Sequence, residues 1–231
     1  MKTLYLTFKH PSTYLVAGPT GCGKTQWVAK LLKHRMIEKP PERIVWVYAE
    51  WQPLYTSLQS DVPELEFVKG IKSNLYESFD PKTRNLLVLD DQMSEAGNST
   101  QLTQLFTKGS HHRNLSIVYI VQNVFDKGRS MRTVSLNSQY LVIFKNPRDQ
   151  SQLSILANQI FPRASKQLNE AFQAATQVPY GYLLLDLRPE TPDSLRVRTR
   201  VFPYDGMVVY PIETKENELL EIECLSDSDS D

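Results

Sequence analysis

The chain has 231 residues, of which 41% are hydrophobic, and its 26 basic and 26 acidic residues cancel to zero net charge. This length suits a single α/β domain, and the apolar content allows a sizeable core. The longest apolar runs have about five residues, such as 117–121, which excludes a transmembrane helix. The start is short and mixed in polarity, so we expect no secretory signal. Two cysteines argue against a disulfide framework and favour a reducing compartment, cytosol or nucleus.

Charge is unevenly distributed along the chain. Residues 213–231 hold eight acids and one lysine, and without them the chain has 25 basic and 18 acidic residues. This composition is typical of a disordered tail, so we expect one domain over residues 1–212 and an acidic tail over 213–231. Between residues 108 and 148 there are seven bases and one acid. Such a basic section is compatible with a polyanion partner, and a solvated charged face is the alternative interpretation.

Strands alternate with helices along the sequence. Near-continuous apolar runs are typical of parallel strands that are covered on both faces. The alternation therefore predicts an α/β fold with a mostly parallel sheet. The five predicted strands are Tyr14–Ala17, Arg43–Tyr48, Asn85–Asp90, Ser116–Gln122 and Tyr140–Phe144.

Helices are predicted between the strands, and a hairpin near the end of the domain. The first helix starts at Lys24, and apolar periodicity places others around 99–108, 150–161 and 164–175. Two short apolar segments, 180–187 and 195–201, predict a closing hairpin. The segment 51–81 has no clear periodicity except for a short strand near 65–68, so we predict irregular structure there.

The segment 18–25 reads Gly-Pro-Thr-Gly-Cys-Gly-Lys-Thr and fits the phosphate-loop pattern G-x-x-x-x-G-K-[ST] at every defined position. Its glycines let backbone N–H groups surround a phosphate chain, Lys24 can reach the β- and γ-phosphates, and the Thr25 hydroxyl can ligate Mg²⁺. A strand precedes the loop and a helix follows it, so the helix N-terminus faces the phosphates. We expect the nucleotide to contact Gly18, Pro19, Thr20, Gly21, Cys22, Gly23, Lys24, Thr25 and Gln26.

Two adjacent acids end the apolar strand 85–90, as a Walker B site requires. We predict that Asp90 helps to hold Mg²⁺ and that Asp91 polarises the attacking water. The alternative is one functional acid, Asp90, followed by a turn residue. A polar residue, Gln122, ends the next strand. If that strand lies between the loop strand and the Walker B strand, Gln122 reaches the γ-phosphate and acts as a sensor, with Asn123 as a weaker candidate.

Arginines near this strand could stabilise charge on the transferred phosphoryl group from a neighbouring subunit. We favour Arg113 as this arginine finger, with Arg129 and Arg132 as alternatives. Each could instead contact DNA phosphate or form a surface ion pair. The N-K-x-D motif of GTPases is absent, so the expected ligands are ATP and Mg²⁺. No groove-reading motif is visible, so any DNA contact should be independent of sequence.

The phosphate loop, the Asp90–Asp91 pair and the block from 113 to 149 resemble viral genome-packaging ATPases of the FtsK–HerA superfamily. The likeness covers about residues 12–200 and is greatest to polinton- and adintovirus-type elements, with relatives in poxviruses and other large DNA viruses. The resemblance implies a RecA-like (ASCE) P-loop NTPase, a three-layer sandwich with strand order 5-1-4-3-2 and a C-terminal hairpin. One departure is Asp91, where the superfamily often has Glu.

The resemblance also implies a DNA-translocating ATPase that packages double-stranded viral or transposon DNA into a capsid. The implied partners are double-stranded DNA, further copies in a ring (pentamer or hexamer) and a capsid or portal protein, with no membrane. The implied location is the host nucleus or cytoplasm at virus assembly sites, or the virion. Two other functions stay open. One is a nucleotide or small-molecule phosphotransferase with Arg129 and Arg132 as lid arginines, and the other is a nucleotide-dependent binding module without turnover.

Overall fold

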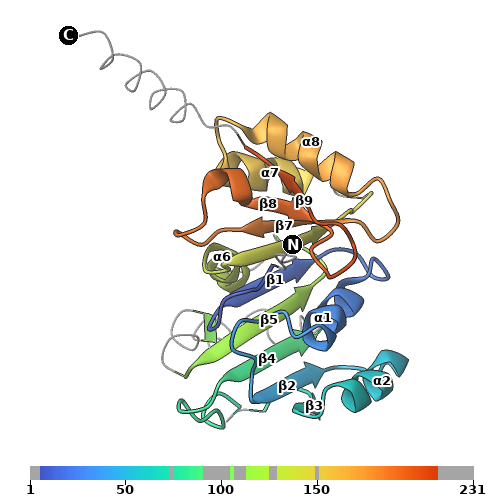
Figure 1. Cartoon of the computed structure of the whole chain (residues 1–231), viewed down its shortest axis with the longest axis vertical. Coiled ribbons are helices and arrows are strands. Elements are labelled where there is room, and N and C mark those ends of the chain that lie inside the picture. The colour runs from blue at the N-terminus through green and yellow to red at the C-terminus, as the bar shows by residue number, and fades with distance from the viewer. Residues whose placement is uncertain are drawn as a thin grey trace, which may run out of the picture.

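The computed structural model describes residues 6–72, 75–90, 105–106, 113–124, 129–148 and 151–212. One twisted sheet runs through this part of the chain, with the strand order β3-β2-β4-β5-β1-β6-β7-β8-β9 (Figure 1). The strands are β1 (Thr13–Ala17), β2 (Arg43–Tyr48), β3 (Leu65–Lys69), β4 (Asn85–Asp90), β5 (Leu115–Val121), β6 (Tyr140–Phe144), β7 (Tyr182–Asp186), β8 (Val197–Thr199) and β9 (Val208–Tyr210).

Six of these strands, from β3 to β6 in the sheet order, pair in parallel. The five strands predicted from apolar runs lie in the order β6-β1-β5-β4-β2, which is the predicted 5-1-4-3-2 arrangement. All residues of β1, β4, β5 and β6 are buried, as expected for parallel strands covered on both faces. One predicted boundary shifts, because β5 ends at Val121 and Gln122 follows it.

The end of the domain is antiparallel. β7 pairs with β6, β8 with β7, and β9 with β8. The predicted hairpin is confirmed with shorter strands. β9 was not predicted, because its three residues are only partly buried and give too short a pattern for periodicity to detect. The acidic tail, residues 213–231, lies outside the described residues.

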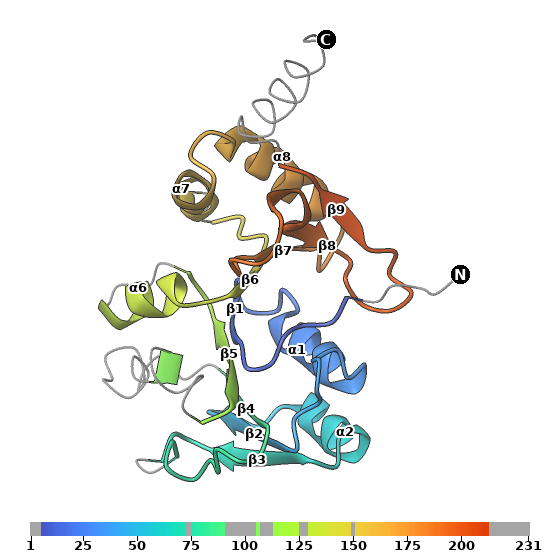
Figure 2. The same cartoon turned by 60° about the vertical axis from the view of Figure 1, so that its left-hand side comes forward.

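Helices cover both faces of the sheet and make three layers (Figure 2). α1 (Lys24–Lys33) and α2 (Pro53–Asp61) pack on one face around a core that contains Trp27, Leu31 and Leu58. On the other face lie α6 (Arg129–Leu136), α7 (Ser151–Ile160) and α8 (Ser165–Ala175), which bury Val134 and Leu168 among other residues. Alternate residues of the buried strands point into the two cores, because successive side chains of a strand face opposite sides.

Two helices correct the sequence prediction. α2 lies in the segment predicted as irregular, and it begins at Pro53, a residue that suits the first turn of a helix because its missing N–H needs no partner there. α6 occupies 129–136, a segment for which we predicted no helix. The predicted helix 99–108 lies outside the described residues apart from the buried Leu105 and Phe106. Within the described residues, no helix combines the length and the apolar character needed to span a membrane.

Candidate functional site

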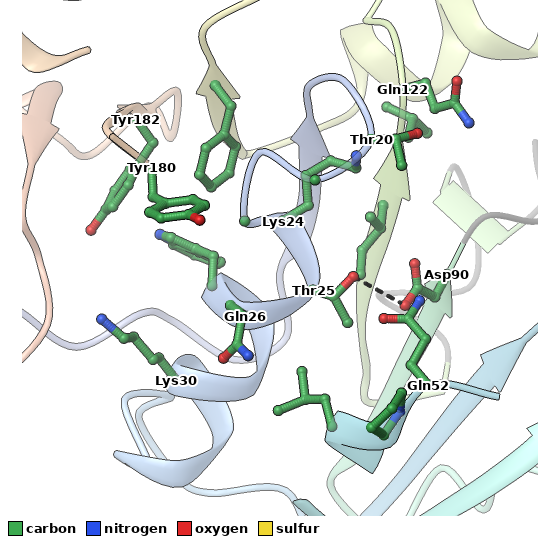
Figure 3. A pocket seen from close by; sticks show the side chains of 18 of the residues that line it. Thr20, Lys24, Thr25, Gln26, Lys30, Gln52, Asp90, Gln122, Tyr180 and Tyr182 are labelled. Atoms are coloured by element: carbon green, nitrogen blue, oxygen red, sulfur yellow. Dashed lines mark hydrogen bonds between the residues drawn. The ribbon is translucent and has the colours of Figure 1, made fainter. Parts of the chain in front are cut away.

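The carboxyl ends of the parallel strands meet at one edge of the sheet. The register pairs Ala17 with Val121 and with Ile143, and Asp90 with Ile120. The carboxyl ends of β1, β4, β5 and β6 therefore lie close together, at the edge where open α/β sheets usually bind ligands. A cavity of about 760 Å³ opens there (Figure 3). Of the predicted site residues, it is lined by Thr20, Gly21, Gly23, Lys24, Thr25, Gln26, Asp90 and Gln122.

The phosphate loop curls between β1 and α1 as its glycines allow. Gly23 is the N-cap of α1 with φ 107°, a left-handed conformation that an L side chain would strain, and no side chain caps the helix. A Cβ on Gly18 would lie 2.7 Å from both Cys22 Sγ and Phe144 Cβ, so a side chain there would displace its neighbours. The N-cap glycine offers no side chain to the amides at the start of α1, and this arrangement suits an anion.

The Lys24 ammonium folds back on the same loop. Its Nζ donates hydrogen bonds to the carbonyl oxygens of Gly18, at 2.7 Å, and Pro19, at 3.0 Å. Cys22 lies half-buried beside it, and burial raises the pKa of its thiol. Cys22, Pro19 and Gly18 support the loop without lining the main cavity.

Asp90 ends β4 with its carboxylate almost fully buried. The Thr25 hydroxyl donates to Asp90 Oδ2 across a long 3.5 Å, drawn dashed in Figure 3. A shorter bond to the same oxygen comes from the Tyr55 hydroxyl of α2, at 2.7 Å. The two predicted magnesium ligands are thus adjacent, and a tyrosine that was not predicted holds one of them. Asp91, the predicted water-activating residue, lies outside the described residues.

Gln122 follows β5, and β5 lies between the loop strand β1 and the Walker B strand β4. Its exposed side chain lines the main cavity and also a second cavity of about 510 Å³ on the far side of the loop. The second cavity is bordered by Lys145, Asn146 and amide side chains of α8. β5 thus lies between the two strands that the sensor prediction assumed, the sensor role of Gln122 stays a prediction, and the partly buried Asn123 is not among the residues that line either cavity.

Two of the candidate arginine fingers, Arg113 and Arg132, are not among the residues that line this cavity. Arg113 precedes β5 at the opposite edge of the sheet, where its guanidinium donates to the Phe79 carbonyl at 3.1 Å and stacks 5.0 Å from the Tyr76 ring centre. Arg132 is exposed on α6, and the side chain of Arg129 is outside the described residues. His111 and His112 also lie outside them, and the described residues contain no group of three or more His, Cys, Asp or Glu side chains arranged for a metal.

The other end of the main cavity is aromatic. Tyr180, in the turn before β7, is 72% exposed with φ 60°, and its ring lies 3.4 Å from where a Cβ on Gly23 would sit. The next residue must be glycine, because a Cβ on Gly181 would lie 2.4 Å from the carbonyl oxygen of Ala175. This tight turn presents the tyrosine beside the loop (Figure 3).

Buried aromatic rings also line this end of the cavity. Burial raises the pKa of Tyr182 to about 12, so its phenol stays neutral, and it accepts a hydrogen bond from the Val201 N–H. Phe202 is buried beside it, with the Lys30 ammonium 5.4 Å above its ring centre. Sequence reasoning missed this end, because its residues come from α1, from the start of β7 and from the residues after β8, and no local pattern links them.

Solved structures resemble this fold at low sequence identity. The genome packaging NTPase B204 from Sulfolobus turreted icosahedral virus 2, in complex with ATP-gammaS, aligns at 14% identity with a TM-score of 0.55, covering 88% of this chain and 98% of that chain. The structure described as the DNA-packaging ATPase B204 from Sulfolobus turreted icosahedral virus gives 12% identity, a TM-score of 0.53, and coverage of 88% and 100%.

A third structure, EssC (ATPases 2 and 3) from Geobacillus thermodenitrificans, has 13% identity and a TM-score of 0.52, covering 94% of this chain and 44% of that chain. At these identities the likeness shows a P-loop NTPase-like fold, with a mostly parallel core and antiparallel C-terminal strands. No protein-family model matches the sequence, and a search of curated proteins finds no match.

Proposed function

We propose that this chain is an ATPase whose main cavity binds ATP with Mg²⁺ and hydrolyses the γ-phosphate. One observation carries the proposal: Gln122 follows a strand that lies between the phosphate-loop strand and the strand of Asp90, and it lines the same cavity as Lys24 and Thr25. This strand order and a polar residue at this position support assignment to the RecA-like (ASCE) class of P-loop NTPases.

The cavity suits a nucleotide at both ends. Its volume falls within the range of ligand pockets, roughly 300 to 1,000 Å³. Uncapped helix amides and Lys24 lie at one end and suit phosphates, because both present N–H donors to an anion. Tyr180, Tyr182 and Phe202 lie at the other end and suit a purine base, since aromatic rings stack on bases. The neighbours B204 with ATP-gammaS and with AMPPCP are consistent with an adenine nucleotide.

Oxygen donors in the cavity suit Mg²⁺, which takes hard oxygen ligands and keeps several of its waters. Thr25 and Asp90 would hold it, because their side-chain oxygens already face each other across 3.5 Å. When bound, Mg²⁺ neutralises negative charge that builds up on the phosphates during transfer. Two protein oxygens are enough for such an ion, so the lack of a larger acid cluster among the described residues is no obstacle.

The chain's own residues divide the remaining work. Lys24 releases its two loop carbonyls to contact phosphate oxygens, and Gln122 donates from its amide to the γ-phosphate or the attacking water. Asp91 accepts a proton from that water in this proposal. Because an aspartate is one methylene shorter than a glutamate, the attacking water must lie closer to the main chain for Asp91 to accept this proton.

The proposed biological role is ATP-driven movement of double-stranded DNA into a capsid by a homo-oligomeric ring. The fold likeness to viral packaging ATPases supports this role, and so does the positive charge of the chain without its tail. Arg132, Lys145 and Arg148 are exposed and available to phosphate backbones. A capsid or portal protein would be the further partner.

The test is steady-state ATP hydrolysis at low salt, with and without long double-stranded DNA, on wild type and on two variants. DNA should stimulate wild type several-fold, while Lys24→Ala should bind ATP much more weakly and Asp91→Asn should bind ATP without hydrolysing it. A hydrolysis rate that is the same with and without DNA would contradict the translocation role but not the proposed ATPase activity. Consumption of ATP only when a nucleotide acceptor is added would favour the phosphotransferase.

A mixing experiment tests the arginine finger. Arg113 would have to exchange its contacts with Phe79 and Tyr76 for the neighbour's γ-phosphate. Arg113→Ala should bind ATP normally and hydrolyse it slowly. Rings mixed from Arg113→Ala and Asp91→Asn subunits should regain activity, because one interface in the mixture has both residues. No recovery at any ratio would exclude Arg113 and turn attention to Arg129 and Arg132.

A further inference from the structure

Tyr55 contacts the carboxylate of Asp90 more closely than Thr25 does. Its hydroxyl donates to Asp90 Oδ2 at 2.7 Å, whereas the Thr25 hydroxyl reaches the same oxygen at 3.5 Å. Both partners are buried: Tyr55 is 0% exposed and Asp90 is 3% exposed. A hydrogen bond to a carboxylate away from water is among the stronger kinds, so this contact helps to fix the orientation of Asp90.

The ring of Tyr55 is itself fixed. It stacks on Phe67 at 4.7 Å between ring centres and 28° between planes, and it contacts Trp46 and Trp51 at 5.5 Å each. Packing on several sides leaves the side chain one rotamer, because a different χ1 would collide with these rings. The hydroxyl of Tyr55 is therefore a donor whose position is fixed by the surrounding rings. These rings, together with Tyr48, are called the aromatic cluster below.

We propose that Tyr55 is a positioning residue for the metal: its hydroxyl holds the Asp90 carboxylate in the orientation that lets it share Mg²⁺ with Thr25. This inference rests on the proposed function, because it names a residue that serves the same site. α2 carries the tyrosine, and its first residues, Pro53 and Leu54, line the cavity, so the helix forms the wall on the metal side.

The competing explanation is that the Tyr55 hydroxyl only satisfies a buried carboxylate and supports the fold. That explanation predicts a change in stability and no change in metal dependence. If Tyr55 positions Asp90, loss of the hydroxyl should change the dependence on Mg²⁺ while the affinity for nucleotide without metal stays normal. Removing the partner of an oriented metal ligand typically costs about 10- to 100-fold in metal affinity.

Tyr55→Phe is the informative variant, since it keeps the ring in the cluster and removes only the hydroxyl. Tyr48→Phe is the matched control, because Tyr48 lies in the same cluster, 5.7 Å from Tyr55 between ring centres, and on the strand that pairs with Asp90. The readouts are the affinity for a fluorescent ATP analogue in EDTA, the Mg²⁺ concentration that half-saturates the gain in affinity, and the thermal midpoint.

We expect Tyr55→Phe to match wild type in EDTA and to need about 10-fold more Mg²⁺, with Tyr48→Phe within about twofold of wild type. An unchanged Mg²⁺ requirement in Tyr55→Phe would overturn the inference and leave the proposed function intact. A wild type that does not bind the analogue, or binds no better than Lys24→Ala, would instead overturn the proposed function.

A second variant covers the case in which Tyr55→Phe does not fold. Asp90→Asn removes the buried charge that would otherwise lose the tyrosine donor, so the double variant Tyr55→Phe, Asp90→Asn should fold. If Tyr55 acts through Asp90, the Mg²⁺ requirement of the double variant equals that of Asp90→Asn alone. A further rise of several-fold in the double variant would contradict the inference, because the tyrosine would then act on the metal by another route.

Discussion

The two ends of the main cavity are built in different ways. The phosphate end comes from one continuous loop, 18–25, and from two residues at strand ends, Asp90 as the last residue of β4 and Gln122 directly after β5. The aromatic end comes from α1, from the turn at Tyr180 and from the segment after β8. Backbone amides and a lysine define the first, and ring packing defines the second. A nucleotide bound at both ends would have its phosphates held by a local sequence motif, and its base would be selected by residues that only the tertiary structure brings together.

Loss of the lysine should have the largest effect on the phosphate end. Lys24→Ala removes an ammonium that bonds charged oxygens, which is worth about 3 kcal/mol, or about 100-fold in ATP affinity. Isothermal titration with ATP and with inorganic triphosphate measures it. Both ligands should weaken alike, and a loss confined to ATP would mean that the lysine does not serve the phosphates.

Gln122→Ala should slow hydrolysis with little change in affinity. Its amide lies at the phosphate end, and one hydrogen bond made mainly in the transition state is worth about 2 kcal/mol, or about 30-fold in rate. Single-turnover hydrolysis and equilibrium binding of ATP separate the two effects. Equal losses in affinity and rate would show that Gln122 already contacts ATP in the ground state and does not act as a sensor of hydrolysis.

Tyr180→Ala should weaken ATP about 10-fold, because one stacked base is typically worth about 1 to 3 kcal/mol. Inorganic triphosphate should bind as before, since it has no base. Tyr180→Phe keeps the ring and serves as the control, with affinity close to wild type. If alanine weakens triphosphate as much as ATP, the tyrosine supports the loop and the two ends are not separate.

Cys22 should give the smallest effect. Burial raises the pKa of its thiol, so less thiolate is present at neutral pH, and alkylation should be a few-fold slower than that of a free cysteine. The rate should rise with pH up to the raised pKa, and ATP should protect the thiol. A Cys224→Ser background isolates the site for mass spectrometry. Alkylation as fast as a free thiol would contradict the burial of Cys22.

Much of the fold was readable because buried parallel strands leave long apolar runs. β1, β2, β4, β5 and β6 were predicted within one or two residues, and their order in the sheet is as expected. α2 was missed because only Tyr55 and Leu58 of its residues are buried, too few to mark a helical period. β9 was missed because it is short and partly exposed, and it gains its place by pairing with β8.

The site residues also fall into those that a sequence pattern predicted and those that it did not. Residues 18–25, Asp90 and Gln122 were found because their chemistry depends on sequence spacing and on strand ends, and the structure gathers most of them around one cavity. Tyr55 and Tyr180 were not found, because nothing near them in the sequence shows that their side chains reach Asp90 and Gly23. The role of Asp91 stays a prediction, since that residue is outside the described part of the chain.

The most direct test of the central claim, that one nucleotide spans both ends of the cavity, is a crystal structure of the protein with Mg²⁺ and a non-hydrolysable ATP analogue. We predict that the phosphates lie against residues 18–25, the metal between Thr25 and Asp90, and the base against the ring of Tyr180. A base directed instead into the second cavity, beside Asn146 and α8, would contradict the claim and remove the role assigned to the aromatic end.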